Sequence, residues 1–123
     1  MERQRSADDA WTLLDRIHLR NPYEVYQRGD SYRVVGYSPS GQDHRHRITG
    51  EAVRYLGDKL RRRAVTASQA AEVLRPMAAR FGLAYTYGDQ VRYSAQAVLL
   101  VLVASGQASV EKEGRSYVYH IKG

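Results

Sequence analysis

The sequence predicts an α+β fold in which four helices and three β-hairpins form one domain over residues 1–123. Two observations lead to this class. Apolar residues recur at three- and four-residue spacing in several segments, which is typical of amphipathic helices. Between them lie short segments rich in tyrosine and valine, separated by glycine-containing turns, which is typical of hairpins. No linker interrupts the 123 residues, and 43% of them are hydrophobic, so one core is expected.

The first helix is expected from Ser6 to Asn21. Ser6 is a favourable N-cap, and Asp8 and Asp9 would lie in the first turn, near the positive end of the helix dipole. Residues 10, 13, 14 and 17 are apolar at helical spacing. Pro22 ends the helix, because proline disfavours helical geometry in the residue before it.

A hairpin is expected next, with strands at 23–26 and 32–37 and a turn at Arg28-Gly29-Asp30. The same three residues match the integrin-binding tripeptide, but a turn requires glycine and aspartate in any case. After Ser38-Pro39-Ser40-Gly41 the sequence is polar, and a loop is expected to continue through Arg47.

Two further helices follow. Thr49 can cap the second helix, which turns Val53, Leu56 and Leu60 inward. Thr66 and Gln69 have the spacing of a capping box at the start of the third helix. Pro76 should kink or split this helix, because proline removes a backbone donor and crowds the preceding turn.

Short strands are expected at 83–87 and 91–93, around Gly88-Asp89. Ser94 then caps a fourth helix that runs to Ser105. The chain ends in a hairpin with strands at 109–112 and 115–121 and a turn at Glu113-Gly114.

The last third of the chain resembles the helix-plus-wing end of winged-helix DNA-binding domains. The residues that carry the resemblance are Leu99, Leu100, Leu102, Gly106, Val110, Gly114, Arg115, Tyr117, Tyr119 and Ile121. With the second and third helices included, it covers about residues 48–121. The resemblance implies a winged-helix-like C-terminal half, with helix 94–105 in the major groove and Lys112 and Arg115 on phosphate.

Helix 94–105 departs from that pattern. A recognition helix needs polar side chains that reach base edges, whereas Gln96 is the one residue of this kind between Ala95 and Ala104. A helix that is apolar on every side is buried, so the sequence favours a central core helix or the seam of a homodimer. A dimer is expected because 123 residues leave little interior to surround a helix.

The charge indicates a polyanionic partner. The net charge is +6, and arginine supplies 16 of the 19 basic residues. Arg45 and Arg47 precede the second helix, and Arg61, Arg62 and Arg63 follow it. We therefore expect a nucleic-acid-binding protein, with duplex DNA favoured, that uses these arginines on phosphate and Lys112 and Arg115 secondarily. Arginines at a helix C-terminus also stabilise the helix dipole, which is the plainer explanation for residues 61–63.

Tyrosine suggests the alternative. Ten tyrosines occur beside a single phenylalanine, and nine of them fall in expected strands. Tyrosine is frequent at protein interfaces, so a small protein-interaction module or adaptor with a tyrosine-rich sheet surface is the second hypothesis. Tyrosine also suits half-buried strands without any further role.

Catalysis is not expected. The sequence contains no phosphate-binding glycine loop and no nucleophile elbow. It also contains no cysteine, which excludes disulfides and thiolate ligands. His44 and His46, beside Asp43, have the spacing of a metal pair but lack further ligands nearby in the sequence. No enzyme activity, cofactor or metal is expected. Since the longest apolar run has eight residues and the N-terminus is charged, no membrane partner or export signal is expected either, and the cytoplasm is the expected location.

Overall fold

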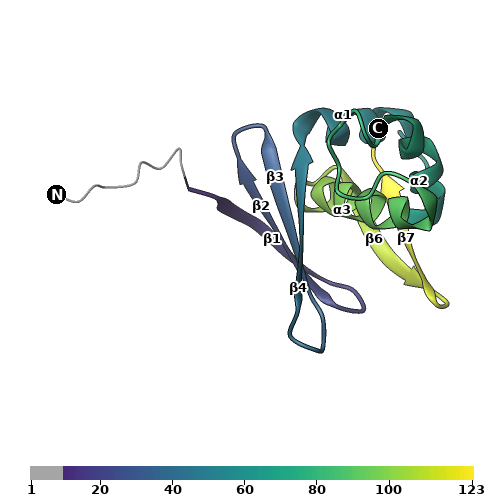
Figure 1. Ribbon diagram of the computed structural model, residues 1–123. Coiled ribbons are helices and arrows are strands. Elements are labelled where there is room, and N and C mark those ends of the chain that lie inside the picture. Colours follow the sequence, from purple (N-terminus) through teal and green to yellow (C-terminus); the bar gives the residue numbers. More distant parts are fainter. Residues whose placement is uncertain (1–9) are drawn as a thin grey trace.

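The computed structural model describes residues 10–123 and has two antiparallel sheets with helices between and above them (Figure 1). The larger sheet has the order β1-β2-β3-β4, and the smaller one has the order β5-β7-β6. The strands are β1 (Thr12–His18), β2 (Pro22–Arg28), β3 (Ser31–Tyr37), β4 (Asp43–Thr49), β5 (Ala64–Val65), β6 (Ala108–Glu113) and β7 (Ser116–Ile121). The helices are α1 (Gly50–Lys59), α2 (Ala67–Leu74) and α3 (Val91–Ala104), with 3₁₀ turns η2 (Arg75–Met77) and η3 (Gly88–Gln90). The α+β class is therefore confirmed.

Helix α3 lies at the centre of the molecule, as the sequence predicts for residues 94–105. It contacts α1, α2, β6 and all four strands of the larger sheet. From Ala97 to Leu102 its side chains are buried on every side, and Val98, Leu100 and Leu102 are fully inaccessible. Within residues 10–123, neither α3 nor any other helix has the length and apolar character needed to cross a membrane.

The two helices before α3 begin as their sequences predict. Thr49 Oγ1 accepts a hydrogen bond from the Ala52 amide, 3.3 Å away, at the start of α1. Thr66 and Gln69 form the expected capping box of α2, with both reciprocal bonds present. Pro76 splits the expected third helix: α2 ends at Leu74, and the backbone tightens into η2. Local hydrogen bonding is sufficient to determine these boundaries.

The first predicted helix is wrong, so residues 10–123 contain three α-helices rather than four. Within the described residues this segment is β1, which pairs with β2; Ser6, Asp8 and Asp9 lie outside the described residues. The register shifts between Leu13 and Asp15, which makes Leu14 the extra residue of a β-bulge. Leu14 and Ile17 both pack against the core, and their three-residue spacing imitates a helix.

The loop predicted through Arg47 is also wrong, because residues 43–49 form β4. This strand pairs with β3 over its whole length. His46 and Ile48 turn toward the core, while Arg45 and Arg47 are exposed on the other face. The alternation has a period of two residues, as in any half-buried strand, but polar residues fill most positions.

The strands predicted at 83–87 and 91–93 do not form. Val91 begins α3, and it is fully buried. Ser94 does not cap the helix. Its hydroxyl accepts a hydrogen bond from the Tyr85 amide at 3.0 Å and donates one to the Tyr85 carbonyl at 2.9 Å. Tyr85 is therefore bonded to a helix side chain rather than to a neighbouring strand.

Two of the three predicted hairpins are confirmed, β2–β3 and β6–β7. Gly29 has a φ of +62° in the first turn, which favours glycine. Asp30, in the same turn, accepts two hydrogen bonds from the Arg54 guanidinium of α1, at 2.9 and 3.1 Å. The backbone amide of Gly50 donates to the Asp30 carbonyl at 2.7 Å. These bonds join the larger sheet to the start of α1.

We expect Leu100→Ala to lower the free energy of unfolding by about 2–5 kcal/mol, because it leaves a cavity in a close-packed core. Leu13→Ala is the matched control, since Leu13 is 36% exposed on β1, and its effect should stay below about 1 kcal/mol. Urea unfolding of both variants measures the difference. Equal losses would mean that α3 is not the centre of the core.

Candidate functional site

The outer face of the larger sheet, which points away from α3, collects most of the charged side chains of its strands. The pairing places alternate residues of the four strands on this face. Val35 lies there too: it is buried, but it is not part of the core cluster. We call this surface the arginine–tyrosine face. Its polar members are Arg16, Glu24, Tyr26, Arg28, Arg33, Tyr37, Asp43, Arg45 and Arg47.

Glu24 organises one half of this face. Its Oε1 accepts hydrogen bonds from the hydroxyls of Tyr26, at 2.7 Å, and Tyr37, at 2.8 Å. Its Oε2 accepts one from Arg16 Nε at 2.9 Å. One carboxylate therefore links side chains from β1, β2 and β3. The two tyrosine hydroxyls and the Arg16 guanidinium stabilise the ionised form and lower the pKa of Glu24 to about 2.

Trp11 lies over the other half, just before β1. The guanidinium carbon of Arg28 is 4.6 Å from the centroid of its ring, and that of Arg33 is 4.4 Å away. These are cation–π distances. The indole therefore orients two arginines of the face without neutralising their charge.

Two arginines of the face oppose each other directly. Arg33 on β3 pairs with Arg47 on β4, and Arg45 is two residues further along β4, opposite Val35. Like charges at directly opposed positions destabilise a sheet. Asp43 is the carboxylate paired with Arg45, with Arg45 Nη2 3.3 Å from Asp43 Oδ2. Among the described residues, neither Arg33 nor Arg47 forms an ion pair with a carboxylate.

The structure brings some of the predicted arginines together and separates the others. Arg45 and Arg47 lie on one face, but on a strand rather than in the expected loop. Arg61, Arg62 and Arg63 follow α1, and Lys112 and Arg115 lie at or beside the β6–β7 turn. Figure 1 shows α1 and the tip of that hairpin at opposite ends of the molecule. These three groups therefore do not form one continuous basic surface.

The structural surroundings of Arg61–Arg63 explain much of why three arginines follow α1. Arg61 Nη2 lies 2.5 Å from Asp58 Oδ1, one turn back in α1. Arg62 has a φ of +62°, which is uncommon for a residue other than glycine. The Arg63 carbonyl accepts a hydrogen bond from the Ile121 amide at 2.9 Å, which ties the turn to β7. Residues 61–63 therefore terminate α1 and connect it to β7 of the smaller sheet.

Three residues of the face were missed by the sequence analysis: Arg16, Arg28 and Arg33. Arg16 fell within a predicted helix, and Arg28 in a turn. For Arg28 and Arg33, the signal that could have found them is the alternation of residues 24, 26 and 28, opposite 35, 33 and 31, across a correctly predicted hairpin.

The possible metal ligands do not form a convincing centre. Asp43 lies on the opposite face of β4 from His44 and His46, so these three groups do not converge. Among the described residues, Glu111, Glu113 and His120 place one ligand atom each within 4.8 Å of the others. The two carboxylates are exposed, and His120 Nε2 lies 2.7 Å from Glu111 Oε2. A cross-strand pair on the open side of the smaller sheet accounts for this cluster.

Comparison of the chain with protein-family models, with curated proteins and with solved structures gave no match.

Glu24→Gln should be less stable than the natural protein above pH 4.5, and the difference should shrink as the pH falls. The pKa of Glu24 is lowered in the folded state from 4.5 to about 2. Its ionised form therefore stabilises the fold above pH 4.5, and this contribution is lost between about pH 4.5 and 2. Urea unfolding across that range measures the change.

Glu113→Gln is the matched control, because it removes an exposed carboxylate that lies outside this network. A stability difference for Glu24→Gln that is independent of pH would contradict the assigned network.

Proposed function

We propose that the protein binds nucleic acid through the arginine–tyrosine face. The observation that carries the proposal is the direct opposition of Arg33 and Arg47 on an exposed sheet, beside Arg45. Such a pair costs folding stability, whereas a phosphate between two guanidiniums would be held by both. Arginine offers a planar fork of donors that fits phosphate, which a lysine does not.

The balance of charge on this face supports the proposal. Five arginines (residues 16, 28, 33, 45 and 47) stand against two carboxylates (residues 24 and 43), which leaves a formal charge of +3. Both carboxylates already contact arginines, at 2.9 and 3.3 Å. The excess positive charge is concentrated around β3 and β4, where Arg33, Arg45 and Arg47 lie.

The dimensions of the face suit a stretch of duplex DNA. Each of its strands has seven residues, which at about 3.3 Å per residue gives a length of about 23 Å. This is about two-thirds of a turn of the duplex. Tyr26 and Tyr37 could instead stack on the bases of a single strand. We favour the duplex because Tyr26 and Tyr37 are both partly buried, which leaves less of each ring face free to stack on a base.

The resemblance to winged-helix proteins remains a proposal about the C-terminal half. Helix α3 is followed by the β6–β7 hairpin, in the order that the resemblance implies, and Lys112 and Arg115 would then contact phosphate secondarily. The burial of α3 leaves no side chain of its central turns free to read bases. We therefore propose no major-groove role for it. The absence of catalytic activity stays a prediction from the sequence.

The second candidate function is a protein-interaction module. The exposure of Tyr87 (78%) and Tyr93 (46%) favours it, because exposed tyrosine is frequent at interfaces. A homodimer through α3 loses its rationale, since one chain already covers this helix. A dimer through another surface stays a prediction. Salt separates the two functions, because counterion release weakens nucleic-acid binding steeply and affects a tyrosine-rich interface little.

The combined change of Arg33, Arg45 and Arg47 to Gln should weaken binding to a 20-base-pair duplex. It should also reduce the slope of log affinity against log salt by up to about 2.7, at about 0.9 for each lost phosphate contact. Fluorescence anisotropy at four salt concentrations measures both quantities. The same series with a 20-nucleotide single strand shows which form the face prefers.

The matched control changes Arg61, Arg62 and Arg63 to Gln, which removes the same charge from the end of α1. We expect its salt slope to stay within about one unit of that of the natural protein. An equal loss of slope in both variants would show that net charge, rather than this face, determines binding. Undetectable binding by the natural protein at 50 mM salt would refute the proposed function.

A further inference from the structure

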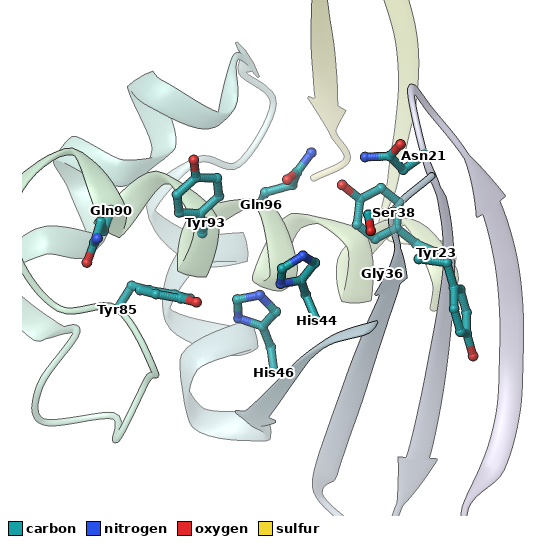
Figure 2. Close-up of a pocket in the computed structure, with 11 residues that line it drawn as sticks. Asn21, Tyr23, Gly36, Ser38, His44, His46, Tyr85, Gln90, Tyr93 and Gln96 are labelled. Carbon is teal, nitrogen blue, oxygen red and sulfur yellow. The ribbon is translucent and has the colours of Figure 1, made fainter. Parts of the chain in front are cut away.

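A cavity of about 380 Å³ lies on the inner side of the larger sheet, between that sheet and the first turns of α3. It lies on the other side of these strands from the arginine–tyrosine face, and Tyr37, at the end of β3, is the one residue that belongs to both. Figure 2 shows the rings of His44 and His46 beside each other on β4, with Tyr85 directed toward them and Tyr93 and Gln96 on α3. The complete lining is Asn21, Tyr23, Gly36, Tyr37, Ser38, His44, His46, Tyr85, Gln90, Tyr93 and Gln96.

The lining is polar but contains no Asp, Glu, Lys or Arg side chain. It consists of aromatic and imidazole rings, three carboxamides, one serine and one glycine. Such a wall can stack on a flat ring and can both donate and accept hydrogen bonds at its edge. It offers no carboxylate, ammonium or guanidinium to pair with a charged group, so its chemistry suits an uncharged ligand.

His46 is the group that most requires a partner. Its Nδ1 is buried and has no hydrogen bond among the described residues. A buried polar atom left without a partner costs about 1–3 kcal/mol, and such atoms are rare in folded proteins. Burial and the neighbouring His44 lower the pKa of His46 and favour its neutral form. A neutral imidazole has one donor and one acceptor, which can pair with the edge of a ring.

The wall around His46 is held in place before any ligand arrives. The Tyr85 ring centroid is 5.6 Å from that of His46 and 5.6 Å from that of Tyr93. Both backbone polar groups of Tyr85 are bonded to Ser94, which is fully buried. On the far side, Tyr23 lies against Gly36, where an added Cβ would be 2.8 Å from its ring. A preformed cavity binds with a smaller loss of entropy.

We propose that this cavity binds a single purine or pyrimidine base, free or as a nucleoside. Its volume is at the low end of the range for small-molecule sites, so it suits one base with its sugar rather than a dinucleotide. Stacking on Tyr and His rings, together with carboxamides at the base edge, is the way in which proteins recognise unstacked bases. The absence of a cation from the lining predicts that a 5′-phosphate does not improve binding.

Binding of adenosine, guanosine, cytidine and uridine tests the proposal. In heteronuclear NMR titrations, we expect at least one nucleoside to shift the signals of His44, His46, Tyr85 and Gln96 in a saturable way. The corresponding 5′-monophosphate should bind no more tightly. No shift of these signals up to 5 mM of any of the four nucleosides would overturn the proposal.

Two variants locate the site. His46→Ala should weaken nucleoside binding at least tenfold, while His18→Ala, which removes an exposed histidine from β1, should leave it unchanged. Gln96→Met keeps the length and helix preference of the side chain and removes its carboxamide. It is therefore the second variant with which to test the cavity if His46→Ala does not fold. We expect at least a tenfold loss there too.

Equal affinity in the cavity variants and the His18 control would overturn the proposal. Micromolar Zn²⁺ that shifts the two histidine signals, with no nucleoside response, would also overturn it in favour of a metal pair. These outcomes are independent of the DNA salt series, because the two sites lie on opposite sides of the sheet.

Discussion

The need to cover α3 from all directions determines the architecture. Its residues from Ala95 to Leu102 are all apolar except Gln96, and most of them are inaccessible. Removing so much apolar surface from water is favourable only if neighbours of matching shape surround the helix, because interiors are packed as densely as crystals. One chain supplies that cover with α1, α2, the smaller sheet and the inner face of the larger sheet. The inner face of the larger sheet is therefore apolar and buried against the core at Val25, Val34 and Ile48.

Because only the inner face of the larger sheet packs against the core, its outer face is free to carry charge. Each strand alternates between its two faces, so apolar residues at one set of positions permit arginine and tyrosine at the other. The sheet thus separates two chemistries. Its outer face carries ionised groups that Glu24 and Trp11 orient, and its inner face, beyond the end of the apolar packing, carries imidazoles and tyrosines around a cavity. Both surfaces follow from one pattern of alternation.

The sequence interpretation failed where tertiary pairing changed the meaning of a local pattern. The bulge at Leu14 gave β1 a helix-like spacing of apolar residues. In β4 the alternation was present, but Ile48 is the sole apolar member of its inner face, and the histidines concealed the strand. Tyr85 is of a residue type that is frequent in strands, yet its backbone is hydrogen-bonded to the Ser94 hydroxyl of α3. Of the candidate face, Arg45 and Arg47 could be predicted from charge alone, whereas Arg16, Arg28 and Arg33 could not.

The sequence by itself determined the features that depend on neighbouring residues. These include the Thr49 cap, the Thr66–Gln69 capping box, the break at Pro76 and the two confirmed hairpins. It also determined that α3 is buried, since a helix without a polar side has no stable exposed position. Only the tertiary structure decided which arginines share a surface and that His46 faces a cavity. Both depend on the register between strands, which arises from long-range packing and shifts with a single bulged residue.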